Sequence, residues 1–219
     1  MDKDFKITLS KIECLSNIQE YSRMYLKTLP DESKVILVGK QGVGKTCISD
    51  QFNLGKLNPN LTQTIGASFI AKEIPTKNGP ITMHVWDTAG QERYRSLIPL
   101  YARNAIVALI IFDVTDLDSY NQIFSIWIDE INKNADPNCL IYLIANKVDL
   151  PAQFDIDAAE EEAKKNGFYF KRISALNNES VLDLFSDVAD AISKLPIPQL
   201  NKSHIQSDSI QPNESSDCC

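Results

Sequence analysis

One lysine that follows a glycine-rich loop offers the clearest chemistry in this sequence. The stretch VILVGKQGVGKT, Val35–Thr46, leaves four apolar residues through the spacing Gly39-x-x-x-x-Gly44-Lys45-Thr46. Glycines let backbone N–H groups approach an anion closely, and a following helix points its positive dipole end at the same place. Lys45 would then reach the β- and γ-phosphates of a nucleotide. The spacing therefore predicts a phosphate-binding loop rather than a turn with a surface lysine.

The composition favours an intracellular globular protein with one sizeable core. The chain has 219 residues, 43% of them hydrophobic, and a net charge of −7 without a basic stripe, so nucleic acid is not expected as a partner. The longest apolar run, AIVALIIF at 105–112, is far too short to span a bilayer. The opening MDKDFK lacks the order of a signal peptide, and the five cysteines do not suggest a disulfide framework.

Strand-like and helical patterns alternate along the chain and must position this loop. Strands are predicted at Lys34–Gly39, Ala67–Ile74, Ile81–Trp86, Ala105–Val114, Cys139–Asn146 and Tyr169–Ser174. Helices are predicted at Lys45–Leu54, Ser119–Asn134, Asp157–Asn166 and Ser180–Lys194. The alternation predicts an α/β fold with a doubly wound, mostly parallel six-stranded sheet. The turn sequence KNGP at 77–80 predicts a hairpin that makes the second strand antiparallel.

Two segments fall outside the predicted core, residues 34–194. Residues 1–33 contain a possible amphipathic helix before Pro30, which could pack on the domain or bind a partner. Its apolar positions are Ile12, Leu15, Ile18, Tyr25 and Leu29. Residues 195–219 are rich in Ser, Asn, Gln and Pro and end in Cys-Cys, so we expect a flexible tail.

Four further motifs lie at predicted strand ends, where open α/β sheets bind ligands. They are WDTAGQERY at Trp86–Tyr94, NKVD at Asn146–Asp149, SAL at Ser174–Leu176 and TIGASF at Thr64–Phe69. In this order and spacing they resemble the Ras superfamily of small GTPases, and more closely the Rab family, over about 34–195. TIGASF, GQERYRSL and the final Cys-Cys are Rab-like, and IGASF with SLIPLY is most similar to the endosomal branch. The resemblance implies a small-GTPase G domain of the P-loop NTPase fold that binds GTP or GDP.

The resemblance assigns the nucleotide contacts to three groups of residues. Around the phosphates lie Gln41, Gly42, Val43, Gly44, Lys45, Thr46, Cys47, Thr64 and Gly90; around the base lie Asn146, Lys147 and Asp149, then Ser174, Ala175 and Leu176. The Asp149 carboxylate can accept bonds from guanine N1 and N2, a donor pair that adenine lacks. Asn146 would brace the base-binding loops, the Lys147 stem would lie along the ring, and Ala175 N–H would contact guanine O6. Alone, NKVD could also be a surface turn.

The resemblance also implies a magnesium site and a catalytic glutamine. Thr46 and Thr64 would bind Mg²⁺, and Asp87 would hold the ion through water. Gly90 N–H would contact the γ-phosphate, and Gln91 would orient the attacking water.

Two loops, about Lys56–Ile65 and Gly90–Arg103, would be ordered only while GTP is bound. The effector-binding residues implied are Ile65, Phe69, Trp86 and Tyr101. For Trp86, plain core packing is an equal alternative.

The chain departs from the family pattern at a few positions. Gln41 replaces a small residue near the γ-phosphate and Gln91, where it could disturb hydrolysis. Leu57 replaces an aromatic residue over the guanine face, which could cost about 1 kcal/mol of affinity. Leu176 replaces the lysine of the usual SAK motif, and YARNA replaces the commoner YYRGA. Because the phosphate lysine, the metal ligands and Asp149 remain, we expect nucleotide to bind.

The terminal Cys218 and Cys219 would carry two prenyl chains in the Rab pattern, although a pair of free thiols is the alternative. The family implies an exchange factor, a GTPase-activating protein, effectors, a dissociation inhibitor and a prenylation escort as partners. It also implies reversible attachment to the cytosolic face of endosomal membranes.

Three functions could use these motifs. The first is a GTP-hydrolysing switch in vesicle traffic, slow without an activating protein. The second is a hydrolysis-poor binding module, suggested by Gln41 and Leu57 but opposed by intact Gln91, Thr64 and Asp87. The third, a P-loop kinase or ATPase, is disfavoured because the NKVD motif reads guanine.

Overall fold

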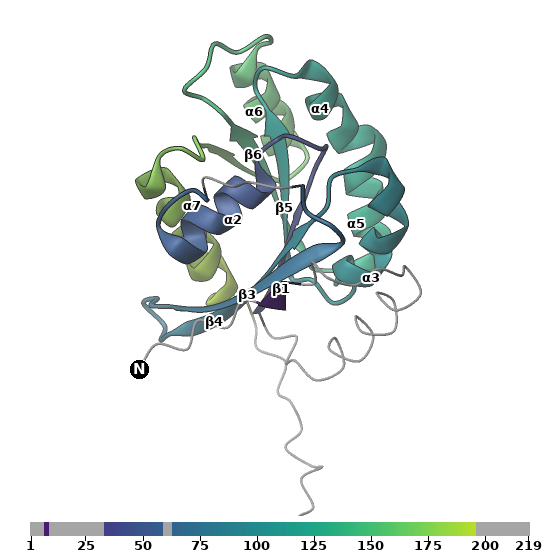
Figure 1. Cartoon of the computed structure of the whole chain (residues 1–219). Coiled ribbons are helices and arrows are strands. Elements are labelled where there is room, and N and C mark those ends of the chain that lie inside the picture. Colours follow the sequence, from purple (N-terminus) through teal and green to yellow (C-terminus); the bar gives the residue numbers. More distant parts are fainter. Residues whose placement is uncertain (1–6, 9–32, 59–62, 196–219) are drawn as a thin grey trace, which may run out of the picture.

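A single mixed sheet runs through the protein, as seen in the computed structural model, which describes residues 7–8, 33–58 and 63–195 (Figure 1). Its strands are β1 (Ile7–Thr8), β2 (Lys34–Val38), β3 (Ala67–Ile74), β4 (Ile81–Thr88), β5 (Val107–Asp113), β6 (Leu140–Asn146) and β7 (Tyr169–Arg172). The spatial order is β1-β3-β4-β2-β5-β6-β7. The hairpin partners β3 and β4 are antiparallel, and β2, β4, β5, β6 and β7 are mutually parallel. The six predicted strands and the single antiparallel pairing among them are confirmed, and β1 adds a short strand antiparallel to β3.

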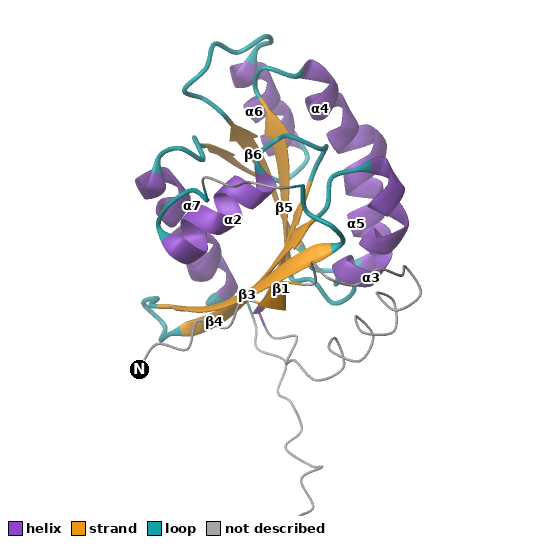
Figure 2. Cartoon of the chain, in the orientation of Figure 1, coloured by secondary structure: helices purple, strands orange, loops and turns teal. Residues whose placement is uncertain are grey.

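Helices cover both faces of this sheet, as the doubly wound prediction requires (Figure 2). They are α2 (Lys45–Leu54), the 3₁₀ segment η2 (Glu92–Leu97), α3 (Ile98–Ala102), α4 (Leu117–Gln122), the π-helical turn η3 (Ile123–Trp127), α5 (Ile128–Asn134), α6 (Ile156–Lys165) and α7 (Asn178–Ile192). The four predicted helices are present. The second runs through α4, η3 and α5 and begins earlier than predicted, because the Asp116 side chain accepts bonds from the backbone N–H groups of Asp118 and Ser119.

Two apolar layers hold the helices against the sheet. Helices α2 and α7 pack on one face, where Phe52 and Phe185 stack with ring centroids 3.8 Å apart. Helices α3, α5 and α6 pack on the other face, where Trp127 and Ile131 are buried. Strands β2 and β5 are buried along their whole lengths, as expected for parallel strands between two helical layers. The central strands therefore form a rigid base for the loops at their carboxyl ends.

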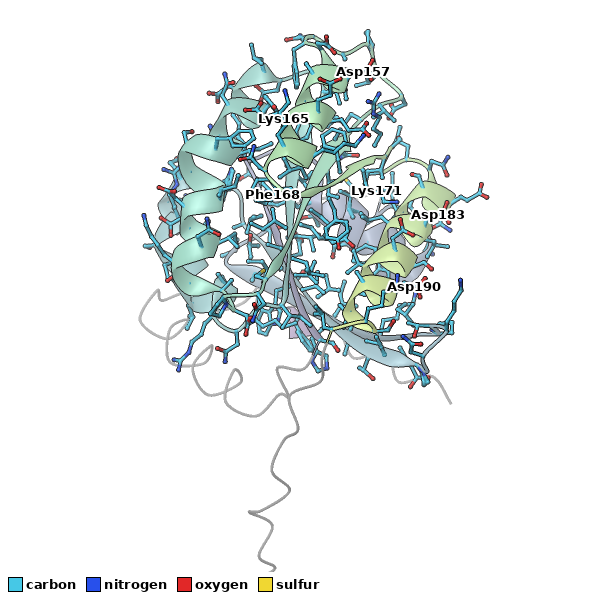
Figure 3. All side chains as sticks on the ribbon, turned by 180° about the vertical axis from the view of Figure 1, so that it is seen from behind. Asp157, Lys165, Phe168, Lys171, Asp183 and Asp190 are labelled. Carbon is cyan, nitrogen blue, oxygen red and sulfur yellow. The ribbon has the colours of Figure 1, made fainter. Side chains whose placement is uncertain are left out.

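Helix α7 is amphipathic, as its apolar spacing predicts. Val181, Leu184 and Phe185 are buried against the sheet, whereas Asp183 is exposed on the outer side (Figure 3). The Asn177 side chain caps the helix by accepting from two backbone N–H groups of the first turn. The helix thereby fixes the position of the preceding SAL segment.

The segment 90–103, expected to be a loop, is largely helical. Leu97, Ile98, Tyr101 and Ala102 are buried at helical spacing in η2 and α3, and burial of this apolar stripe stabilises the helical backbone. The following Asn104 has a φ of +58°, a conformation that asparagine tolerates better than most residues. That backbone requirement explains how asparagine can replace the glycine of the commoner YYRGA sequence.

The predicted helix within residues 1–33 and the predicted tail lie outside the described residues, apart from Ile7–Thr8, Ser33 and Leu195. Among the described residues, every helix is too short or too polar to cross a lipid bilayer.

Candidate active site

The predicted site loops meet at one edge of the sheet. The loops after β2 and β4 and the loop that leads into β3 surround a cavity of about 300 Å³. Its lining residues are Gln41, Gly42, Gly44, Lys45, Thr46, Cys47, Gln63, Thr64, Thr88, Gly90 and Gln91. The parallel strands β2 and β4 present their carboxyl ends here, which is where open α/β sheets bind ligands.

Close packing around the loop after β2 explains two of its glycines. Gly39 has a φ of +145°, and a Cβ there would lie 2.2 Å from the Ile111 carbonyl oxygen. Gly44 has a φ of +99°, and its Cβ would lie 2.3 Å from Asn146 Nδ2. Side chains at these positions would strain the backbone and would collide with Ile111 in β5 and Asn146 in β6. The loop therefore runs close to the sheet and keeps its backbone accessible from the cavity.

Lys45 lies almost fully buried at the start of α2. Its Nζ donates to the carbonyl oxygens of Gly39 at 2.8 Å and Lys40 at 2.9 Å, so the ammonium is fixed across the loop. Burial lowers the pKa of Lys45 to about 8, although the charge of Asp87 acts in the opposite direction. An ammonium that has lost most of its hydration is favourably neutralised by an anion, which suits a phosphate in the adjoining cavity.

Thr46, Thr64 and Asp87 converge from three separate elements. Thr46 Oγ1 donates to Asp87 Oδ2 at 2.8 Å, and Thr64 Oγ1 lies 2.7 Å from Thr46 Oγ1. Because the single Thr46 proton is directed to Asp87, Thr64 must donate to Thr46. This group of two hydroxyls and one carboxylate contains only oxygen donors, the ligands that Mg²⁺ prefers. The residues present therefore fit the predicted magnesium site.

Gly90 and Gln91 lie directly over the phosphate loop. A Cβ at Gly90 would lie 2.3 Å from Lys45 Nζ and 2.7 Å from the backbone nitrogen of Gln41, so only glycine allows this approach. Gln91 is buried, and its side chain bonds to Gln63 and Arg93. Gln41 and Gln91 line the same cavity, and an effect of Gln41 on hydrolysis stays a prediction.

Asn146 joins the phosphate loop to the SAL segment. Its Nδ2 donates to the Val43 carbonyl at 2.7 Å, and its Oδ1 accepts from the Ala175 N–H at 3.0 Å. These two bonds link the phosphate loop to the SAL segment, and the role of Asn146 in nucleotide binding stays a prediction. The Asp149 carboxylate accepts from Ser174 Oγ at 2.5 Å. Leu176 is 66% exposed, and its backbone N–H donates to the same Ser174 Oγ.

Lys147 has a partner that the sequence analysis missed. The residue has a φ of +66°, and its Nζ lies 2.5 Å from Asp113 Oδ2. Burial opposes ionisation of Asp113, but the bonds from Lys147 and from Thr115 outweigh it and lower the pKa of this carboxyl. The available signal was the position of Asp113 at the carboxyl end of a buried strand, at the edge that carries the other site residues.

Thr88 and Gln63 also line the cavity without having been predicted. Thr88 Oγ1 donates to the Leu37 carbonyl at 2.6 Å, so it also ties β4 to β2. Gln63 immediately precedes Thr64, and this adjacency was the only sequence signal for it.

The predicted effector residues are only partly accessible. Phe69, Trp86 and Tyr101 form one aromatic group, with centroids 5.1 Å apart for the first pair and 5.9 Å for the second. Trp86 and Tyr101 are 5% and 1% exposed, so both pack in the core here, whereas Ile65 is 48% exposed. Their effector role stays a prediction. Leu57 is half-buried after α2, and Cys218 and Cys219 lie outside the described residues.

Comparison with known proteins finds the Ras family, whose model matches residues 34–194. Ras-related protein Rab-5A of Dictyostelium discoideum is 34% identical over 165 residues, covering 74% of this chain and 82% of that protein. Ras-related protein Rab-5B of Plasmodium falciparum is 36% identical over 160 residues, covering 73% and 77% respectively. Ras-related protein Rab-4 of D. discoideum is 34% identical over 196 residues, covering 84% and 95%.

Proposed function

The chain belongs to the Rab family of Ras-type small GTPases, and from that premise we propose that it is a GTP-hydrolysing switch that regulates endosomal membrane traffic. In this proposal residues 34–194 form the GTPase domain, and the GTP form recruits effectors. The reaction converts GTP and water into GDP and phosphate.

The convergence of three loops on one cavity carries the proposal. Lys45 and Thr46 come from the phosphate loop, Thr64 comes from the segment before β3, and Gln91 follows β4. Asp87, at the carboxyl-terminal end of β4, completes the oxygen group with the two threonines. A cation, a hydroxyl–carboxylate group and a carboxamide are the groups needed to bind a metal-complexed triphosphate and to orient a water.

Binding follows from the geometry of the individual groups. The glycine loop and Lys45 hold the phosphates, and the Asp149 carboxylate accepts from guanine. Thr46, Thr64 and Asp87 would hold Mg²⁺, which neutralises charge on the β- and γ-phosphates when bound. Asn146 keeps the phosphate and base loops at a fixed separation through its bonds to Val43 and Ala175.

Hydrolysis requires that a water be held in line with the γ-phosphate. We assign this task to the Gln91 carboxamide, which is buried beside the phosphate loop. Slow turnover follows, because positioning alone leaves the transition-state charge incompletely stabilised. An arginine supplied by an activating protein is worth about 10³–10⁵-fold in such reactions.

Switching would follow from contacts made only with GTP. The Thr64 backbone and hydroxyl and the Gly90 N–H would contact the γ-phosphate and hold both loops in place. Loss of that phosphate would release them and change the surface near Ile65 and Phe69. An exchange factor, effectors and a dissociation inhibitor would distinguish the GTP-bound from the GDP-bound state.

Membrane attachment would come from prenyl chains on Cys218 and Cys219, added with the help of an escort protein. The protein would then cycle between the cytosol and the cytosolic face of endosomal membranes.

Single-turnover hydrolysis tests the proposal directly. The full chain, loaded with [γ-³²P]GTP and Mg²⁺, should release phosphate slowly, and Gln91→Leu should slow the release at least tenfold. The purified protein should retain GDP or GTP and no adenine nucleotide. Bound guanine nucleotide without measurable hydrolysis would favour the binding-module alternative, and retention of ATP would refute the switch altogether.

A further inference from the structure

A second glutamine contacts the proposed catalytic glutamine at the mouth of the cavity. Gln91 Nε2 donates to Gln63 Oε1 at 2.5 Å, and Arg93 Nε donates to Gln91 Oε1. We propose that Gln63, with Arg93, is a positioning residue that orients the Gln91 carboxamide for GTP hydrolysis. This inference rests on the proposed GTPase function and names a role that the family motifs do not give to Gln63.

The orientation of each amide follows from donor and acceptor chemistry. An arginine guanidinium has only N–H donors, so the Gln91 atom that faces Arg93 must be its oxygen. The nitrogen of Gln91 must then face Gln63, and Gln63 must present its oxygen in return. Arg93 and Gln63 together therefore select one of the two orientations of the Gln91 amide.

The contacts leave the Gln91 amide with the capacity that catalysis needs. A carboxamide has two N–H donors and two oxygen lone pairs. Gln63 occupies one donor and Arg93 one lone pair, which leaves one donor and one acceptor. The remaining lone pair can accept a hydrogen bond from the attacking water, and the remaining N–H can donate a hydrogen bond to an oxygen of the reacting phosphate. The orientation is thus fixed without blocking the groups that would touch water and substrate.

The position of Gln63 links this orientation to the state of the switch loops. Gln63 is adjacent to Thr64, whose hydroxyl bonds to Thr46 in the proposed metal group. Gln63 and Gln91 line the same cavity, although Gln63 is exposed and Gln91 is buried. When the loop carrying Thr64 is in place, Gln63 is therefore within reach of Gln91. Because Gln63 is exposed, it can be replaced with little effect on the core.

Variants at Gln63 separate orientation from loop structure. Gln63→Met keeps the length of the side chain but removes the acceptor, and should slow single-turnover hydrolysis about three- to tenfold, the worth of one hydrogen bond. Gln63→Glu keeps an acceptor and should be faster than Gln63→Met. The release rate of bound GTP should be unchanged in Gln63→Met, which adds no charge to the cavity. Gln153→Met replaces a matched exposed glutamine and should hydrolyse GTP like the wild type.

A double-mutant cycle decides whether Gln63 acts through Gln91. In a Gln91→Leu background, Gln63→Met should have no further effect. If Gln63→Met slows hydrolysis equally with and without Gln91→Leu, Gln63 only supports the loop. If the Gln63→Met single variant hydrolyses GTP as fast as the wild type or faster, Gln63 does not position the Gln91 amide. Either result overturns the inference while the proposed function stands. A wild-type protein that hydrolyses no GTP would instead refute the proposed function, and the positioning role with it.

Discussion

Lys147 shows how one residue connects the predicted base-binding motif to the rest of the site. Its left-handed backbone directs the chain around the NKVD turn, and its ammonium is paired with Asp113. The stem of the side chain is therefore held at both ends. A stem fixed in this way can lie along a guanine ring with little further loss of side-chain entropy.

We predict that Lys147→Met raises the pKa of Asp113. The folded-state pKa of Asp113 lies below its ordinary value of 3.8, so this carboxylate stabilises the fold above that pH, and the contribution is lost as the pH falls through the lowered pKa. The Lys147→Met protein should therefore unfold at a lower temperature than wild type at pH 7, and the difference should shrink below about pH 4.

Carboxyl ¹³C NMR titration and thermal melts at both pH values measure these effects. Lys133→Met is the matched control, because Lys133 forms an exposed helical ion pair with Asp129. An Asp113 pKa that is the same in wild type and Lys147→Met would contradict the pairing.

At the scale of elements, the site depends on ties between loops that belong to different strands. Asn146 ends β6 and bonds to both Val43 and Ala175, so one side chain sets the distance between the phosphate and base loops. Strand β1 makes a second long-range contact, because it pairs with Ser68 and Phe69 at the start of β3.

Asn146→Ala should destabilise the nucleotide-free fold by about 2 kcal/mol and speed guanine nucleotide release. The reason is that the Val43 carbonyl and the buried Ala175 N–H both lose their side-chain partner. Urea denaturation and release of a fluorescent guanine nucleotide measure the two effects. Asn138→Ala, at an exposed loop asparagine, should change stability by less than about 0.5 kcal/mol. A stable Asn146→Ala protein with unchanged release would show that the loops are held by other contacts.

The β1–β3 pairing predicts slower hydrogen exchange at the outer edge of β3. Facing residues in antiparallel strands alternate between bonded and non-bonded pairs, so replacing both Ile7 and Thr8 by proline removes the donor whichever pair is bonded. Amides near Ser68 and Phe69 should then exchange faster by mass spectrometry. The control with valine at both positions keeps the backbone donors and should protect the edge like wild type. Equal exchange in the two variants would argue against the strand.

At the scale of the whole molecule, the net charge limits how the protein could attach to a membrane. The chain carries −7, and the segment from Leu195 to Cys219 has one lysine against two aspartates and one glutamate, with His204 neutral. Such a segment gains no attraction from an anionic membrane surface, which requires a basic cluster. One lipid chain alone binds reversibly, and stable anchoring takes two signals.

Cys219→Ser alone should therefore move much of the protein to the cytosolic fraction, and the double serine variant at Cys218 and Cys219 should be wholly cytosolic. Cell fractionation measures the distribution, and mass spectrometry of the membrane fraction should find two prenyl additions on the wild type. Cys139→Ser, at a half-buried cysteine of the domain, is the control. A Cys219→Ser protein that remains as membrane-bound as wild type would contradict the two-chain requirement.

The sequence by itself determined six strands, four helices and the spacing of the main site motifs, because these depend on neighbours in the chain. The apolar runs predict β2 and β5, the glycine spacing predicts the loop around Lys45, and helical periodicity predicts α7. Weak local patterns were less informative. In residues 92–102 the apolar positions form only a short stripe, so the helical structure depends on the burial of Leu97 and Tyr101 against other elements.

Only the tertiary structure decided which distant residues meet. Asn146 and Val43 are 103 positions apart, Gln91 and Gln63 are 28 apart, and no local pattern specifies either pair. The same holds for Lys147 and Asp113, whose contact depends on β5 and β6 being neighbours in the sheet. Strand order and register determine these contacts, because packing of both helical layers selects one arrangement from several that the local patterns would allow.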